Sequence, residues 1–162
     1  MRPTGARSAV LGLACLTATM AFALATATSA FAIALPFHSN MSGAQQAATG
    51  IPGDPDGSGT ASFSLDTISH NVCFTVSWSN VTPPVGFGHI HEGAAGQVEN
   101  PGFTIPLFMT TSTAGVSSPQ SGCTLTIPGQ IEAINLLPSF FNVVIHNLEH
   151  PVGAIRGQIV RG

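Results

Sequence analysis

Two histidines that are separated by one residue, His89 and His91, have the residue type and spacing for metal chemistry. On a β-strand, side chains two residues apart point to the same face of the sheet, about 6.5 Å apart along the strand. Neutral imidazole is a common ligand of copper and zinc. His146 is the best candidate for a third ligand, and His150 is a weaker fourth. A copper or zinc site is therefore one of two interpretations of this pattern.

The second interpretation is structural. Histidines also hydrogen-bond backbone groups of neighbouring loops, and here Glu92 and Arg156 are candidate partners. Glycines surround the histidine pair, among them Gly93 and Gly96, and glycine permits positive φ angles or the close approach of two chain segments. Sequence spacing alone does not bring His146 to the pair, so both interpretations stay open.

Alternating apolar and polar residues predict the strands that would position these histidines. In the segment 60–66, Ala61, Phe63 and Leu65 alternate with hydroxyl and acidic residues. Similar patterns predict strands at 72–79, 87–92, 103–108, 123–127, 140–146 and 153–160, and a short helix at 130–137. About seven strands with one short helix predict an all-β fold, an antiparallel Greek-key sandwich or barrel. Trp78 is expected in its core.

The first 32 residues have the features of a secretory signal peptide. Two arginines precede an apolar run over 9–27, and small residues follow at the expected cleavage site. The run is long enough to span a membrane, but its early position favours removal, and no membrane contact is expected after cleavage. The remaining chain is predicted to consist of a loose N-terminal segment, 33–58, and a β domain, 59–162.

Cysteine usage agrees with export. Cys15 lies inside the expected signal peptide, and the stretch around it does not fit a lipid-attachment motif well, so no lipid anchor is expected. Cys73 and Cys123 are the only pair left, and an oxidising compartment would join them. Such a disulfide is worth roughly 4 kcal/mol on the loop-entropy model. Two free buried thiols are the alternative.

The charge pattern restricts the classes of partner. The chain has no lysine, and only Arg156 and Arg161 lie outside the expected signal peptide, against seven carboxylates. Nucleic acids and anionic lipid surfaces need clustered positive charge, so both are excluded as partners. An extracellular protein or a carbohydrate is the expected partner.

Two blocks of sequence carry a family resemblance. The first is GHIHEGAAG at 88–96, and the second combines HN at 146–147 with PVGAIRGQI at 151–159. Together they resemble the CHRD domain, named for its repeats in chordin and also found singly in secreted microbial proteins. The resemblance covers roughly 59–160 and implies an extracellular setting and a fold rather than an activity. Ala154 stands where the family often has Glu, so no role of that carboxylate is carried over.

The histidine segment is also similar to the strand-borne histidine pair of copper–zinc superoxide dismutase. No histidine lies between His91 and His146 to bridge two metals or to supply zinc ligands, so dismutase activity is not expected. No Gly-x-Ser-x-Gly motif or carboxylate pair indicates a hydrolase. We therefore expect no enzyme and no cofactor, with copper or zinc as the alternative.

The last predicted strand carries one of the few cations. Alternation places Arg156 and Gln158 on the face opposite Gly157 and its apolar neighbours. We predict that Arg156 forms an ion pair or a backbone clamp with the histidine loop. The expected function is a secreted, non-catalytic CHRD module that is structural or binds a partner, and the alternative is an extracellular copper- or zinc-binding protein.

Overall fold

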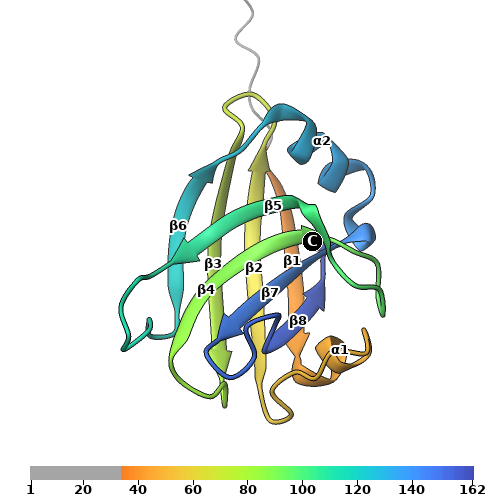
Figure 1. Cartoon of the computed structure of the whole chain (residues 1–162). Coiled ribbons are helices and arrows are strands. Elements are labelled where there is room, and N and C mark those ends of the chain that lie inside the picture. The colour runs from red at the N-terminus through yellow and green to blue at the C-terminus, as the bar shows by residue number, and fades with distance from the viewer. Residues whose placement is uncertain (1–33) are drawn as a thin grey trace, which may run out of the picture. The chain divides into compact units, whose positions relative to one another are not determined.

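Antiparallel strands form one continuous sheet in the computed structural model, which describes residues 34–162 (Figure 1). The nine strands of this part of the chain are β1 (Leu35–Ser42), β2 (Ser58–Asp66), β3 (Asn71–Ser79), β4 (Val85–Glu92), β5 (Asn100–Met109), β6 (Gln120–Leu125), β7 (Phe141–Asn147), β8 (Ile155–Gln158) and β9 (Val160–Arg161). Its helices are α1 (Gly43–Ala47), α2 (Pro128–Leu136) and the 3₁₀ turn η1 (Pro138–Phe140). The expected signal peptide lies outside the described residues.

The strand order is β5-β4-β7-β8-β1-β2-β3-β6, and β9 pairs with β1. The two edge strands, β5 and β6, also lie against each other, so the sheet curls into a nearly closed barrel. In Figure 1, β4, β5 and β7 cross in front of β1, β2 and β3. The predicted all-β antiparallel fold class is confirmed. In this order β7 lies between β4 and β8, and that placement decides which side chains meet.

Alternation along β2 and β3 builds much of the core. Phe63 is paired with Phe74, and both side chains are buried with their apolar neighbours in the barrel interior. Phe63 also stacks on Phe37 of β1, with ring centroids 5.7 Å apart. Trp78, expected in the core, is half-buried and stacks on Phe108 at the edge of the apolar cluster. The core face of the sheet is thus the face predicted from the alternation.

The prediction of a loose N-terminal segment at 33–58 is wrong. Within it, β1 pairs with β2 over its whole length and also contacts β8 and β9, so it lies inside the sheet. Its inward positions are Phe37, Ser39 and Met41, and the polar Ser39 interrupts the apolar pattern. Ser39 faces Gly157, where the two strands approach too closely for a larger side chain. The short helix α1, which follows, was also not predicted.

The helix predicted at 130–137 is present as α2. Ile131 and Ile134 are fully buried against the barrel. Leu137 is 50% exposed because it follows the last helical residue. The strand predicted at 153–160 is divided into β8 and β9, and the backbone N–H of Ile159 between them donates to the carbonyl oxygen of Phe141 at 2.9 Å.

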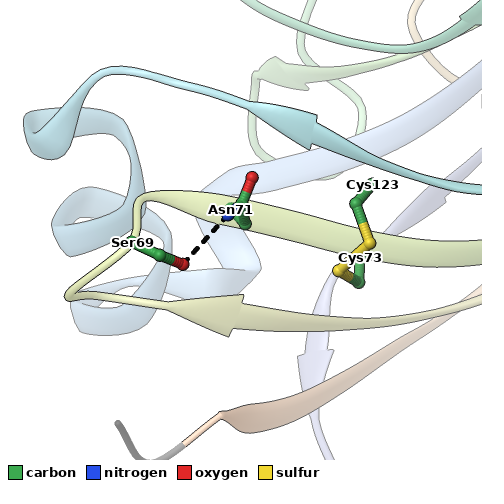
Figure 2. The surroundings of a disulfide bond; sticks show 4 residues. All are labelled: Ser69, Asn71, Cys73 and Cys123. Atoms are coloured by element: carbon green, nitrogen blue, oxygen red, sulfur yellow. Dashed lines mark hydrogen bonds between the residues drawn. A yellow bond between two sulfur atoms is a disulfide. The ribbon is translucent and has the colours of Figure 1, made fainter.

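Cys73 and Cys123 form the predicted disulfide, which joins β3 to β6 (Figure 2). The two residues are directly paired across the strands, with their Cα atoms 4.0 Å apart. Figure 2 also shows the nearby β2–β3 turn, where the Asn71 side-chain amide donates to the Ser69 hydroxyl at 3.0 Å. The bond therefore fastens the edge strand β6 to its neighbour. No helix within residues 34–162 is long and apolar enough to cross a membrane.

Candidate functional site

Three histidine side chains converge on one face of the sheet. His89 and His91 lie on β4, and His146 lies on the neighbouring strand β7. One ring nitrogen from each residue lies within 4.8 Å of the other two. The centroid of the His89 ring is 5.3 Å from that of His91 and 5.3 Å from that of His146. The structure thus brings together the three residues that the sequence analysis selected as ligand candidates.

The pairing of β4 with β7 explains this convergence. His89 and His91 flank the fully buried Ile90, so both side chains point away from the core. In the antiparallel register His146 is opposite Phe87, which is on the same face of β4 as His89. The His146 ring stacks on the Phe87 ring with centroids 4.4 Å apart, and His89 is its diagonal neighbour.

Backbone carbonyl groups set the position of the ring protons. Nδ1 of His146 is 3.2 Å from the carbonyl oxygen of Pro151, and Nδ1 of His91 is 3.3 Å from that of Phe103. A carbonyl oxygen only accepts hydrogen bonds, so these two bonds require the proton on Nδ1 and leave the lone pair on Nε2. The Thr104 hydroxyl also lies 3.3 Å from Nδ1 of His91 and acts as a second acceptor in that tautomer. Nε2 of His146 is buried and has no hydrogen-bond partner among the described residues. The backbone hydrogen bonds of the structural interpretation are present, but they use only one nitrogen of each ring.

Burial keeps the cluster uncharged. Burial, with a smaller effect of the neighbouring His89, lowers the pKa of His146 to about 3. Burial, followed by the effect of His91, lowers the pKa of His89 to about 4. Burial also lowers the pKa of His91, although the Glu99 carboxylate opposes that shift. At neutral pH the rings are therefore neutral imidazoles, the form that ligates metal ions.

Arg156 fastens the loop that follows the histidine strand. Its side chain is 1% exposed and reaches from β8 to the residues after β4. Nη1 donates to the carbonyl oxygen of Gln97 at 2.6 Å and to Oε1 of Glu99 at 2.9 Å. Nη2 donates to the carbonyl oxygens of Gly93 and Ala94 at 2.9 and 3.0 Å. One buried guanidinium thus holds both ends of the 93–99 loop against the last strands.

Two side-chain amides complete this attachment. Gln158 Nε2 donates to the carbonyl oxygen of Gly93 at 3.0 Å, and Asn142 Nδ2 donates to the same oxygen at 2.9 Å. A Cβ atom at position 93 would lie 3.1 Å from Nη2 of Arg156 and 3.3 Å from Nδ2 of Asn142, so a side chain there would crowd both donors. Gly96 turns the same loop with a φ of +73°, a conformation that favours glycine.

Glu92 and Arg156, the two residues proposed as hydrogen-bond partners of the histidines, bond to other groups in the part of the chain that the structure describes. Oε2 of Glu92 instead accepts a hydrogen bond from Asn100 Nδ2 at 2.6 Å. The ion pair of Arg156 is with Glu99, which the sequence analysis did not select. His150 lies outside the three-residue cluster, and its backbone N–H donates to Oδ1 of Asn147 at 2.6 Å.

Sequence reasoning also missed the contact residues Phe87 and Asn142. Each lies an even number of residues before a histidine on the same strand: Phe87 is two residues before His89, and Asn142 is four residues before His146. That periodicity was the available signal, because residues an even number of positions apart share a face of a strand.

In the comparison with protein families, the CHRD domain matches residues 37–159. Searches of curated proteins and of solved structures found no match. The matched region begins within β1, which agrees with its place inside the sheet, and it includes the histidine cluster and Arg156. Because the match covers most of its length, the chain belongs to the CHRD domain family.

Proposed function

We propose that this CHRD domain binds a single copper or zinc ion through His89, His91 and His146, and that it acts outside the cell as a non-catalytic binding module. The observation that carries the proposal is the convergence of three ring nitrogens within 4.8 Å of one another, from two adjacent strands. Strand-borne ligands are held by backbone hydrogen bonds on both sides, which favours a preformed site.

The surroundings of the rings resemble those of metal ligands. Histidines that bind metal commonly donate the other ring N–H to a backbone carbonyl, which fixes the tautomer and the orientation. His146 and His91 both have such an arrangement, through Pro151 and Phe103. A buried nitrogen without a partner costs about 1–3 kcal/mol, and a bond from Nε2 of His146 to an ion would remove that cost.

The donor set restricts the kind of ion. Imidazole suits copper and zinc, whereas calcium and magnesium prefer oxygen ligands, and the three-residue group contains no carboxylate. Copper(II) binds nitrogen sites more tightly than zinc in the usual order of divalent ions. Three protein ligands would leave one coordination position for water or another small ligand.

An extracellular location is part of the proposal. The signal-like character of residues 1–32 supports export, and the Cys73–Cys123 disulfide is of a kind that persists in oxidising compartments. Copper and zinc at such a site would therefore come from the surrounding medium.

Metal titration of protein that carries no histidine tag tests the proposal. We expect one equivalent of Cu(II) or Zn(II) to bind by calorimetry and to remain after dialysis, as measured by elemental analysis. His89→Gln and His146→Gln should each abolish stoichiometric binding. His38→Gln is the matched control, because His38 is exposed on β1 and outside the cluster, and it should bind as the unmodified protein does.

Two results would refute a metal site. One is the lack of stoichiometric metal in the unmodified protein under these conditions. The other is unchanged binding in His146→Gln, provided that the variant keeps a cooperative thermal transition. Nitrogen hyperfine structure in the electron paramagnetic resonance spectrum of the copper form would identify imidazole ligands independently of the variants.

A further inference from the structure

A cavity of about 330 Å³ borders the histidine cluster. It lies where β4 begins and β5 and β7 end, and Figure 1 shows how these strands are arranged. Its walls come from the start of β4, from the 110–113 loop after β5, and from the turn between β7 and β8. This volume lies within the usual range for sites that bind small molecules. A cavity of this size beside three histidines with lowered pKa values has two features that mark binding sites.

The lining of the cavity selects for an uncharged ligand. Apolar groups form most of the wall, through Pro84, Phe87, Leu148 and Pro151. Among residues 34–162, none of the side chains that line it is charged. A charged ligand would therefore lose its hydration without gaining an ion pair, whereas a flat apolar ring would bury its surface against these groups.

Hydroxyl groups at one side supply polar contacts. Within the loop, the hydroxyls of Thr110 and Ser112 accept hydrogen bonds from backbone N–H groups at 3.0 and 3.2 Å. Thr111 and Thr113 also line the cavity, and their hydroxyls form no hydrogen bond among residues 34–162, so both remain available to a ligand. A hydroxyl substituent on the ligand would find both a donor and an acceptor there.

Two cavity residues contact a histidine of the cluster directly. The Phe87 ring stacks on the His146 ring at 4.4 Å, and the Pro151 carbonyl oxygen accepts the hydrogen bond from Nδ1 of His146. A molecule in the cavity would therefore lie one residue away from the cluster. A bound molecule that shifts Phe87 or Pro151 would change the position of the His146 ring through these two contacts.

We propose that this cavity binds a small, uncharged aromatic alcohol of the phenol class and holds it beside the three histidines. The binding itself is independent of a metal ion. The proximity of the bound molecule to an ion rests on the proposed function of the histidine cluster.

The first experiment uses 4-fluorophenol and metal-free protein. Fluorine NMR should show saturable broadening and a shift of the 4-fluorophenol signal. Gly86→Leu should weaken binding at least tenfold, because it adds an isobutyl group at a residue that lines the cavity, where a Cβ atom would meet no protein atom within 4 Å. Gly129→Leu is the matched control, because Gly129 on α2 is equally open and lies outside the cavity, and it should bind normally.

The second experiment adds one equivalent of Cu(II). Paramagnetic broadening of the bound 4-fluorophenol should appear with the unmodified protein and disappear with His89→Gln. Absence of binding to metal-free protein, or equal binding by Gly86→Leu, overturns the proposed cavity ligand. Binding without broadening, in protein shown to hold copper, overturns the placement beside the cluster. Failure to take up copper refutes the proposed metal site instead, and the first experiment then decides the cavity alone.

Discussion

The ring of His146 stacks on the ring of Phe87 with a centroid distance of 4.4 Å, across the boundary between two antiparallel strands. This contact fixes one face of the imidazole, while the hydrogen bond from its Nδ1 to Pro151 fixes the rotation of the ring. The lone pair of Nε2 therefore has a defined direction before any ligand arrives. Preorganisation of this kind increases affinity because little side-chain entropy remains to be lost.

The first prediction concerns this stacking. Phe87→Leu should weaken Cu(II) binding about tenfold, since residues that orient metal ligands typically contribute 10- to 100-fold to affinity. Isothermal titration calorimetry measures the change. Phe108→Leu is the control, because Phe108 stacks on Trp78 instead of a histidine and should leave the affinity unchanged. Equal affinities for the Phe87 variant and the unmodified protein would show that the stacking does not orient the ligand.

The second prediction concerns the pH dependence of the metal-free protein. The pKa of His146 is about 3 and that of His89 is about 4 in the folded chain, both below the ordinary value of 6.5. Below pH 6.5 the unfolded chain therefore binds more protons at these residues than the folded chain does. Stability should fall as the pH is lowered from 6.5, and these two groups stop contributing to the fall below about pH 3.

Thermal unfolding in the presence of a chelator, at pH values from 7.5 to 5.0, measures this dependence. His146→Gln should show a smaller decrease in Tm over that range, because one of the histidines with a lowered pKa is gone. His38→Gln changes an exposed histidine and should keep the full decrease. A Tm that is constant from pH 7 to pH 5 would contradict the prediction.

The third prediction concerns the buried guanidinium. Arg156→Lys should lower stability by about 2–4 kcal/mol, because a single ammonium group cannot replace donors to three carbonyl oxygens and to Glu99. Chemical denaturation gives the free energy of unfolding. Arg161→Lys, at an exposed position, should change it by no more than about 0.5 kcal/mol. Equal stabilities of the two variants would mean that the loop is held by other contacts.

The fourth prediction concerns the closest approach of β8 to β1. A Cβ atom at Gly157 would lie 2.2 Å from the carbonyl oxygen of Asn40 and 2.5 Å from Oγ of Ser39. Gly157→Ala should therefore destabilise the protein by about 3 kcal/mol or prevent its accumulation, since a backbone atom must move. Gly86→Ala meets no atom within 4 Å and should be within about 1 kcal/mol of the unmodified protein. Normal stability of Gly157→Ala would contradict the strand contact.

Local alternation was sufficient for much of the fold. The β2–β3 hairpin was predictable because Phe63, Phe74 and their neighbours repeat with the period of a strand and flank a turn-forming segment. The failure at β1 has a local cause, because Ser39 takes an inward position where Gly157 leaves no room for a large apolar side chain. The sequence of β1 therefore lacks the regular apolar alternation that identifies a strand, and it was predicted to be a loose segment.

The candidate site was predictable in its residues but not in its geometry. The spacing of His89 and His91 places them on one face of a strand wherever that strand lies. Their meeting with His146 depends on the insertion of β7 beside β4 and on a register that sets His146 opposite Phe87. Arg156 reaches Glu99 and the carbonyl oxygen of Gly93 because the 93–99 loop folds back over β8.

The sequence by itself determined the all-β class, the disulfide partners, the family and the identity of the three histidines. The fold class, the cysteine pair and the histidines depend on residue type and on periodicity among near neighbours along the chain, whereas the family was expected from the resemblance of two sequence blocks. The tertiary structure alone decided that the histidines converge, that Nε2 of His146 has no partner among residues 34–162, and that a cavity is lined by Phe87 and Pro151, which contact His146. Such properties depend on strand order and register between distant segments, which closure of the barrel selects and local patterns do not encode.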